Sequence, residues 1–326
     1  MREVRQCPVT KITPALTLGC SFFTVDYGRI GAMTPDAPVS TWFLAVLRAA
    51  MPAVPVIGIN LAIIPRFGRR GGTAVGRVFM HIFVINLERD GARRAQILSH
   101  LKGLGLDAEV LPAVEGAKLP PEALPAGTHP GLSGGEIGCY LSHVRFWETV
   151  VERGLPHAIV LEDDVHCRPD MLNVAEEAIA TGLPFDALRL SALRPIHGKL
   201  LATLSNGVRL VLPTKNPSGT QGYLVSLEGA RRLLEQLSVP RCPIDNALDL
   251  YWKYGLRIPL VSPSVVEEDA SLASTIVGRY GMNERKTVFR HLARVARAER
   301  RKWTVFFMAR RLKASLRAAG RGRGVS

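Results

Sequence analysis

Three adjacent carboxylates, Glu162, Asp163 and Asp164, are the residues of this sequence whose types and spacing point most directly to chemistry. They follow the apolar stretch 157–161, HAIVL, which predicts a buried strand. Neighbouring carboxylates repel one another, so such a run persists most easily beside a hard cation or a basic partner. Mg²⁺ and Mn²⁺ prefer oxygen ligands and complete their coordination with water and substrate phosphates. The run therefore indicates either a divalent-cation site or a solvated acidic turn.

The elements that must position these carboxylates alternate between strands and helices. This alternation predicts an α/β sheet covered on both faces, in which polar sites collect at the carboxyl ends of strands. The acidic run occupies such an end. The predicted strands cover 78–87, 108–114, 157–161, 185–190, 207–212, 219–225 and 257–261, and predicted helices cover 91–104, 169–181, 227–237 and 244–254.

A further helix is predicted to begin after Ser133, because Ser133 and Glu136 have the spacing of a capping box. Apolar residues then recur on one helical face as far as Val151. Cys139 and His143 are four residues apart on this helix and could share a metal ion, but no second pair completes a zinc site in the sequence. We therefore do not predict zinc from the sequence.

Composition and charge narrow the class of protein. The chain has 326 residues, of which 47% are hydrophobic, enough for a core and unlike a disordered chain. The net charge of +14 comes from the two ends, residues 1–78 and 284–326, whereas residues 79–283 carry a small acidic excess. This distribution favours basic appendages on an enzyme-like domain over a nucleic-acid-binding core. The five cysteines include no CxxC pair, which favours a reducing compartment.

The two end segments are expected to differ from the domain between them. Residues 1–78 lack sustained periodicity and predict a poorly structured extension or a misassigned start codon. Their apolar part, 42–65, is interrupted by arginine and proline, and its uninterrupted portion is shorter than the roughly 20 residues of a spanning helix. Residues 284–326 predict a basic amphipathic tail. An anionic membrane surface, a solvated helix and nucleic-acid phosphates are its alternatives, and we expect the membrane surface and no nucleic acid.

A set of short blocks occurs in order over about residues 80–270. The blocks are VINLER at 84–89 followed by Arg93 and Arg94, AVEG at 113–116, GEIGCYLSH at 135–143 followed by Trp147, IVLEDDV at 159–165, GTQGYLVS at 219–226 and PID at 243–245. No block is specific alone, but the ordered set resembles glycosyltransferase family 25 of the lipooligosaccharide-galactosyltransferase type.

The resemblance implies a GT-A-like, Rossmann-type nucleotide-sugar-binding domain over 79–283 with a mixed, mostly parallel sheet. It implies inverting transfer of a hexose, with galactose as first choice, from a UDP-sugar to a saccharide acceptor of lipopolysaccharide or lipooligosaccharide, assisted by Mn²⁺ or Mg²⁺. The acceptor would be lipid-linked, and the protein would lie at the cytoplasmic face of the membrane. The alternative is a non-catalytic, membrane-associated relative that binds glycan or nucleotide.

The resemblance also implies roles for individual residues, each beside a purely structural alternative. Inversion requires a base on the acceptor hydroxyl, and arginine suits phosphate because its planar fork donates parallel hydrogen bonds. The expected metal ligands are Asp163 and Asp164; the donor-binding residues are Asn86, Arg89, Arg93, His143, Glu162 and Asp163; the acceptor-binding residues are Gln221 and Tyr223; and the catalytic candidates are Asp245, Glu268 and Asp269.

Overall fold

The computed structural model describes residues 80–269 and 288–322, with side chains of the last helix described from 297 to 318. The expected extension 1–78 and its apolar part 42–65 lie outside these residues. A central sheet of eight strands has the order β2-β1-β3-β8-β5-β9-β7-β6. Its strands are β1 (His81–Asn86), β2 (Glu109–Pro112), β3 (His157–Glu162), β5 (Ala187–Arg189), β6 (Gly198–Thr203), β7 (Arg209–Pro213), β8 (Gly222–Ser226) and β9 (Leu260–Ser262).

The sheet is mixed. β1 pairs in parallel with β2 and β3, and β5 pairs in parallel with β9. The remaining pairings are antiparallel, so β8 and β7 run against the direction shared by the other six strands. β1 and β3 are buried over almost their whole length, as strands covered on both faces must be.

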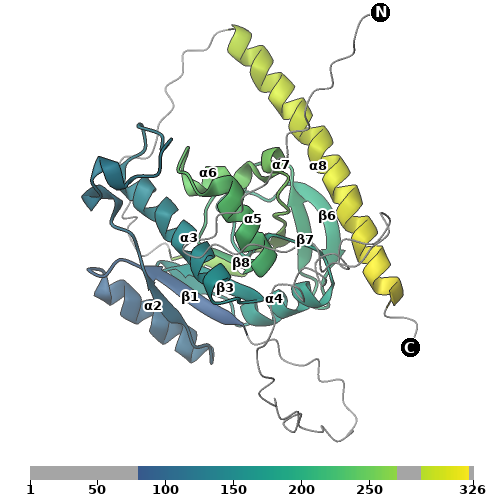
Figure 1. The fold of residues 1–326 in the computed structure, drawn as a ribbon. Coiled ribbons are helices and arrows are strands. Elements are labelled where there is room, and N and C mark those ends of the chain that lie inside the picture. Colours follow the sequence, from purple (N-terminus) through teal and green to yellow (C-terminus); the bar gives the residue numbers. More distant parts are fainter. Residues whose placement is uncertain (1–79, 270–287, 323–326) are drawn as a thin grey trace, which may run out of the picture. The chain divides into compact units, whose positions relative to one another are not determined.

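Helices flank the sheet on both sides. α3 (Gly134–Glu152) and α5 (Leu227–Leu237) pack against each other, and Figure 1 shows α2 (Gly91–Gly103) and α3 on either side of β1. The capping box that opens α3 is present: Ser133 Oγ accepts from the Glu136 amide, and the Glu136 carboxylate accepts from the Ser133 amide. The other described helices of the domain are α4 (Met171–Ala180), α6 (Ile244–Asp249), α7 (Tyr251–Tyr254) and the 3-10 turns η2 (Gly116–Lys118) and η3 (Pro121–Ala123).

The order of the first three strands creates a crevice at the sheet edge. The chain leaves β1 for β2 on one side and then crosses to β3 on the other side of β1. Right-handed crossovers place the connecting helices on opposite faces, so neither of these helices lies across the carboxyl ends of β1 and β3. The last residues of these strands, Asn86 and Glu162, therefore border one opening.

A small second sheet returns the chain to this opening. β10 (Val266–Glu268) pairs antiparallel with β4 (Val165–Cys167), and Glu268 lies opposite Val165. The amide of Asp269 donates a 2.8 Å hydrogen bond to the carbonyl of Asp164. β4, which is only three residues long, and β6, whose residues are mostly exposed, are strands that the sequence patterns did not predict.

The C-terminal helix α8 (Val288–Gly322) contacts β6, β7 and α7. Val305, Ala309 and Leu312 are buried on the side that faces the domain. The α/β class, the mixed sheet and the basic C-terminal helix are thus confirmed. Among the helices of the described residues, none combines the length and the apolar character needed to cross a bilayer.

We predict that Gly138→Ala destabilises the domain by about 1–3 kcal/mol, because overpacking of this size carries that cost. A Cβ at Gly138 would lie 2.4 Å from the Val114 carbonyl oxygen, where α3 presses against the loop before η2. Gly103→Ala is the matched control, because a Cβ there meets nothing within 4 Å. Urea unfolding of both variants measures the difference, and equal stabilities would contradict the proposed close packing.

Candidate active site

The acidic run lies at the opening between β1 and β3. In the parallel register, Ile85 is opposite Glu162, so Asn86 comes opposite Asp163. The Asn86 side-chain amide donates a 2.6 Å hydrogen bond to Asp163 Oδ2. Two residues that are 77 positions apart in the sequence therefore meet because their strands end at the same edge of the sheet.

Arg93, in the first turn of α2, forms ion pairs with two of the three carboxylates. Its Nη2 atom lies 2.7 Å from Asp163 Oδ1 and 2.6 Å from Asp164 Oδ2. Its Nε and Nη1 atoms are buried and have no hydrogen-bond partner among the described residues. An arginine with unpaired N–H donors on two of its nitrogens is suited to bind an anionic group such as a phosphate.

Burial and mutual repulsion set the charges of the run. Burial, followed by the charge of Glu162, raises the pKa of Asp164 to about 6 even though Arg93 opposes the shift. Burial also raises the pKa of Asp163, against the hydrogen bond from Asn86 and the charge of Arg93. The carboxylates therefore remain incompletely neutralised by the protein itself.

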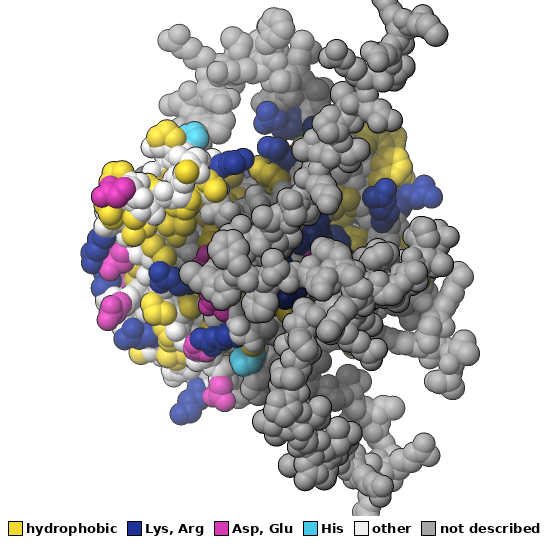
Figure 2. Space-filling view, viewed as in Figure 1, with side chains coloured by type: hydrophobic (Ala, Val, Ile, Leu, Met, Phe, Trp, Pro, Cys, Tyr) yellow, Lys and Arg dark blue, Asp and Glu magenta, His cyan; other side chains and the backbone are white. Residues whose placement is uncertain are grey.

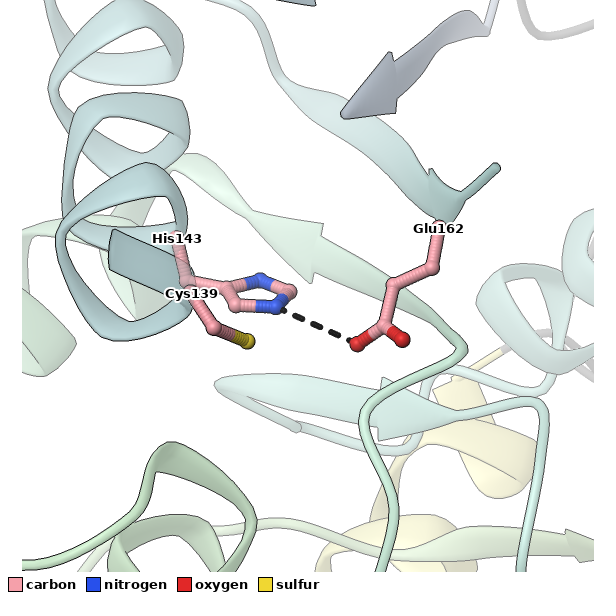
Figure 3. Close-up of side chains that lie close together, drawn as sticks. All are labelled: Cys139, His143 and Glu162. Atoms are coloured by element: carbon pink, nitrogen blue, oxygen red, sulfur yellow. Dashed lines mark ion pairs between the residues drawn. The ribbon is translucent and has the colours of Figure 1, made fainter. Parts of the chain in front are cut away.

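Glu162 behaves differently from the two aspartates. Burial alone would raise its pKa, but His143, Thr220 and Arg93 together lower it. Thr220 Oγ1 donates a 2.5 Å hydrogen bond to Glu162 Oε1, and His143 Nε2 lies 3.6 Å from the same oxygen. Figure 3 shows His143 and Cys139 extending from α3 towards the Glu162 carboxylate at the end of β3.

A buried chain of aromatic residues supports His143. The Trp147 indole N–H donates to the Tyr223 hydroxyl at 2.9 Å, and this hydroxyl lies 3.0 Å from His143 Nδ1. His143, Trp147 and Tyr223 are each no more than 1% exposed. The ring of His143 is thus fixed from behind, and only its Nε2 edge faces the opening.

The residues fit a hard divalent cation. Asp164 Oδ1 and Asn86 Oδ1 are buried oxygens without a hydrogen-bond partner among the described residues. An unpartnered buried oxygen is costly unless a cation or a donor meets it. Carboxylate and amide oxygens beside an incompletely neutralised cluster are the ligands that Mg²⁺ and Mn²⁺ prefer.

Two cavities meet at this cluster. The first, of about 270 Å³, is lined by Asp163, Asp164 and Arg93, by the cations Arg89 and Lys118, and by the glycines that open α3. The second, of about 400 Å³, is lined by Thr220, Asp245, Arg194 and the first turn of α6. Cys139, Glu162 and Gln221 line both cavities. We call the first the diphosphate cavity, for its cations and carboxylates, and the second the α6 cavity.

A buried ion pair holds the wall of the α6 cavity. Arg189 Nη1 lies 2.5 Å from Asp249 Oδ1, with both side chains at most 3% exposed. Arg189 also donates to the Gly219 carbonyl, and Asp249 Oδ2 accepts from the Ser218 amide. The pair thereby anchors the loop before β8, where Ser218 adopts a φ of 55° that non-glycine residues rarely take.

Comparison with known families agrees with this geometry. The family model described as "Glycosyltransferase family 25 (LPS biosynthesis protein)" matches residues 79–248, about half of the chain. The chain belongs to glycosyltransferase family 25. The matched residues include the ends of β1 and β3, both cavities' shared residues and the start of α6.

The curated relatives of this family 25 chain include proteins named as transferases and proteins named as inactive. It is 33% identical over 190 residues to a "Glycosyltransferase 25 family member" of Anopheles gambiae, covering 52% of this chain and 31% of that protein. It is 30% identical over 202 residues to "Procollagen galactosyltransferase 1" of Danio rerio, covering 53% and 32%. It is 32% identical over 187 residues to "Inactive glycosyltransferase 25 family member 3" of Mus musculus, covering 52% and 31%. The match thus spans about a third of the length of these relatives.

Solved structures resemble it only distantly. A glycosyltransferase involved in the glycosylation of the major capsid of PBCV-1 aligns with 9% identity and a TM-score of 0.33, covering 69% of this chain and 98% of that one. A Drosophila galactosyltransferase variant in complex with manganese, UDP-Gal and xylobiose aligns with 12% identity and a TM-score of 0.30, covering 67% and 80%.

The structure places the expected metal and donor residues of the family 25 domain together. Asn86, Arg93, Asp163 and Asp164 are in contact, and His143 approaches Glu162. Arg89 lines the diphosphate cavity but is largely exposed and pairs with Glu115 at 2.6 Å.

The expected acceptor and catalytic residues are more widely spread. Gln221 lines both cavities, whereas Tyr223 is buried in the core and lines neither. Asp245 lines the α6 cavity and Glu268 the diphosphate cavity. Asp269 lines neither, and its carboxylate accepts a 3.1 Å hydrogen bond from Gln96.

Three positions that shape the cavities were not found from the sequence. Thr220 orients Glu162, and the Arg189–Asp249 pair anchors the cavity wall. Thr220 lies inside the block GTQGYLVS, which marked this segment as part of the site, but nothing in the sequence identified Glu162 as the partner of Thr220. No local pattern marked Arg189 or Asp249, because their partnership joins residues 60 positions apart.

We predict that Asp164→Asn raises the melting temperature of the metal-free protein at about pH 8 and changes it little below about pH 3.5. The pKa of Asp164 is raised from 3.8 to about 6, so the wild-type carboxyl binds a proton on folding and the free energy of unfolding falls as pH rises through this window. Asparagine mimics the protonated form. Calorimetry across pH, with the exposed Glu235→Gln as control, measures this, and a pH-independent shift would contradict it.

Proposed function

We propose that this protein is a glycosyltransferase that moves a hexose, galactose as first choice, from a UDP-sugar to a saccharide acceptor of lipopolysaccharide or lipooligosaccharide, with inversion and with Mn²⁺ or Mg²⁺. The observation that carries the proposal is the junction of two cavities at Glu162, one rich in cations and carboxylates and the other bordered by a separate carboxylate. Family membership supports the reaction class, and the family description and the galactosyltransferase relative support the finer choices.

The diphosphate cavity suits the donor. Arg93 offers unpartnered N–H groups, Lys118 and Arg89 add positive charge, and the first turn of α3 borders the cavity. Helix amino-terminal amides and arginines are recurrent phosphate-binding groups. A cation held by Asp163 and Asp164 would neutralise the charge that develops on the departing nucleotide diphosphate.

The α6 cavity suits the acceptor, and Asp245 suits the base. Inverting transfer requires that the acceptor hydroxyl attack from the side opposite the leaving diphosphate. Asp245 lines the α6 cavity and not the diphosphate cavity, so it is on the required side, whereas Glu268 borders the diphosphate cavity. We therefore assign proton removal to Asp245. Gln221, which lines both cavities, would contact the sugar between them.

The competing proposal is a relative that binds glycan or nucleotide without catalysis, since family 25 includes proteins named inactive. The retained contacts favour an enzyme. Partial burial and mutual repulsion raise the pKa of two of the three clustered carboxylates, and a purely structural role does not explain this folding cost.

We predict that the purified chain transfers sugar from a UDP-hexose in the presence of Mn²⁺, and that Asp164→Asn lowers kcat by about a hundredfold or more. A panel of nucleotide sugars with lipooligosaccharide acceptors, read by UDP release and product mass, tests this. Asp245→Asn should lose transfer while donor binding, measured by calorimetry, persists. Glu235→Gln, an exposed carboxylate on α5, is the control.

A chain that binds a UDP-sugar with Mn²⁺ but transfers to no acceptor and hydrolyses no donor would contradict the enzymatic proposal and favour the binding relative. Failure to bind any nucleotide sugar would contradict both. Equal kcat losses in the Asp164→Asn and Glu235→Gln variants would contradict the proposal that the acidic run binds the metal ion.

We further propose that α8 places the enzyme on the anionic cytoplasmic face of a membrane, beside a lipid-linked acceptor. Trp303, Phe306 and Phe307 form an aromatic cluster with ring centroids 5.5–6.3 Å apart. Trp303 and Phe307 are more than half exposed, while Val305 and Leu312 on the other side are buried against the domain. At the right of Figure 2, hydrophobic and Lys or Arg side chains lie together on the described surface.

Such a surface matches the headgroup layer of a bilayer, in which aromatic rings insert and each basic residue contributes on the order of 1 kcal/mol near anionic lipid. Nucleic acid is less well matched, because the aromatic residues on α8 contact one another and do not present separate stacking platforms.

We predict that the protein sediments with vesicles containing phosphatidylglycerol and not with vesicles of phosphatidylcholine alone, and that a Trp303→Ala/Phe307→Ala variant binds at least about tenfold more weakly. The buried core is untouched in this variant, and transfer to a soluble acceptor serves as the folding control. Binding to DNA in place of vesicles, or vesicle binding that the variant leaves unchanged, would contradict the proposal.

A further inference from the structure

The junction of the two cavities contains three different metal-ligating side chains. Cys139 Sγ, His143 Nε2 and a Glu162 carboxylate oxygen all lie within 4.8 Å of one another. The sequence placed only Cys139 and His143 together, one turn apart on α3. The third ligand comes from the end of β3, and Figure 3 shows the three side chains converging.

The histidine in this cluster is prepared to accept a ligand. His143 is 1% exposed, and its Nε2 atom has no hydrogen-bond partner among the described residues. The Tyr223 hydroxyl meets the opposite nitrogen, Nδ1, at 3.0 Å. A metal-bound histidine characteristically has its other ring nitrogen fixed by such an outer partner, which sets the direction of the ligating nitrogen.

The donor set shares Glu162 with the acidic run but adds a sulfur and a nitrogen ligand. Asp163 and Asp164 offer only oxygen, which suits Mg²⁺ and Mn²⁺, whereas a thiolate and an imidazole select Zn²⁺ and similar softer ions. Zinc–ligand bonds of about 2.0–2.3 Å bring tetrahedral ligands to within about 4 Å of each other. The His143–Glu162 separation of 3.6 Å already satisfies this, so a modest rotation of Cys139 completes the arrangement.

We propose that Cys139, His143 and Glu162 form a second metal site that binds Zn²⁺, and that the bound ion inhibits transfer. Binding converts the Cys139 thiol to a thiolate and releases its proton, and it leaves a fourth position open towards the cavities. Cys139 and Glu162 line both cavities, so the ion occupies the passage between donor and acceptor. The proposed inhibition by Zn²⁺ rests on the proposed transferase function, whereas the proposed binding of Zn²⁺ does not.

Cobalt substitution of the purified full chain tests the site without any activity measurement. Co²⁺ bound by a thiolate gives an intense near-ultraviolet charge-transfer absorption, which oxygen ligands do not give. We expect this absorption in the wild type and in Asp164→Asn, with one Co²⁺ displaced by one Zn²⁺. We expect it to vanish in Cys139→Ser and to persist in Cys242→Ser, which alters another free cysteine of the described residues.

The activity arm compares inhibition by Zn²⁺ at saturating Mn²⁺. Cys139→Ser should need at least about tenfold more Zn²⁺ for half inhibition than the wild type, in line with the loss of one ligand group. Circular dichroism confirms that the variant is folded.

Each outcome separates the two proposals. No thiolate absorption, or an absorption that survives in Cys139→Ser, overturns the zinc site. An absorption with the expected variant pattern in a chain that transfers no sugar supports the site and contradicts the transferase proposal. An active enzyme that binds cobalt as expected but that Zn²⁺ inhibits equally in wild type and Cys139→Ser overturns the inhibitory role.

Discussion

Repulsion among three partly buried carboxylates is the constraint on which the rest of this site depends. Glu162, Asp163 and Asp164 lie next to one another at the end of β3. Burial reduces the solvent screening between their charges and so strengthens their repulsion. Arg93 reaches two of them with a single nitrogen, and Asn86 donates to one. Because this neutralisation is incomplete, the cluster retains unpartnered oxygens that a cation can use.

Close packing and a buried ion pair hold the residues around the cluster in place. If the walls could move, the carboxylates would separate into solvent and the affinity for a cation would fall. Gly138 and Gly116 allow α3 to press against the loop that lines the diphosphate cavity, at a distance that no Cβ could occupy. On the other side, the Arg189–Asp249 pair ties the loop before β8 to α6. The attraction within such a buried pair is largely offset by the cost of removing both charges from water, so its clearest consequence here is the fixed position of the loop.

Glu162 differs from its two neighbours because its environment favours its charged form, through His143, Thr220 and Arg93. It also lines both cavities, as do Cys139 and Gln221. The same small set of side chains therefore stands between the groups suited to phosphate and those suited to a saccharide. In the proposed reaction the sugar passes between donor and acceptor at this position, and in the proposed zinc site a softer metal meets sulfur and nitrogen there. The two proposals thus arise from one geometric fact.

Local patterns in the sequence determined the elements and one half of the site. The buried run of β3, the capping box of α3, and the acidic triplet at a strand end were all readable, because hydrophobic periodicity and capping act over a few residues. The approach of Asn86 to the acidic run could be expected because strand ends in an α/β sheet collect at one edge, whereas the metal and donor roles came from the family resemblance and stay predictions. Only the tertiary structure decided that Tyr223 lies in the core, that Glu268 and Asp245 border different cavities, and that Glu162 completes a cluster with Cys139 and His143. Those facts depend on crossovers and on the pairing of β10 with β4, which join residues tens of positions apart, and no local preference of the chain encodes which distant segment it will meet.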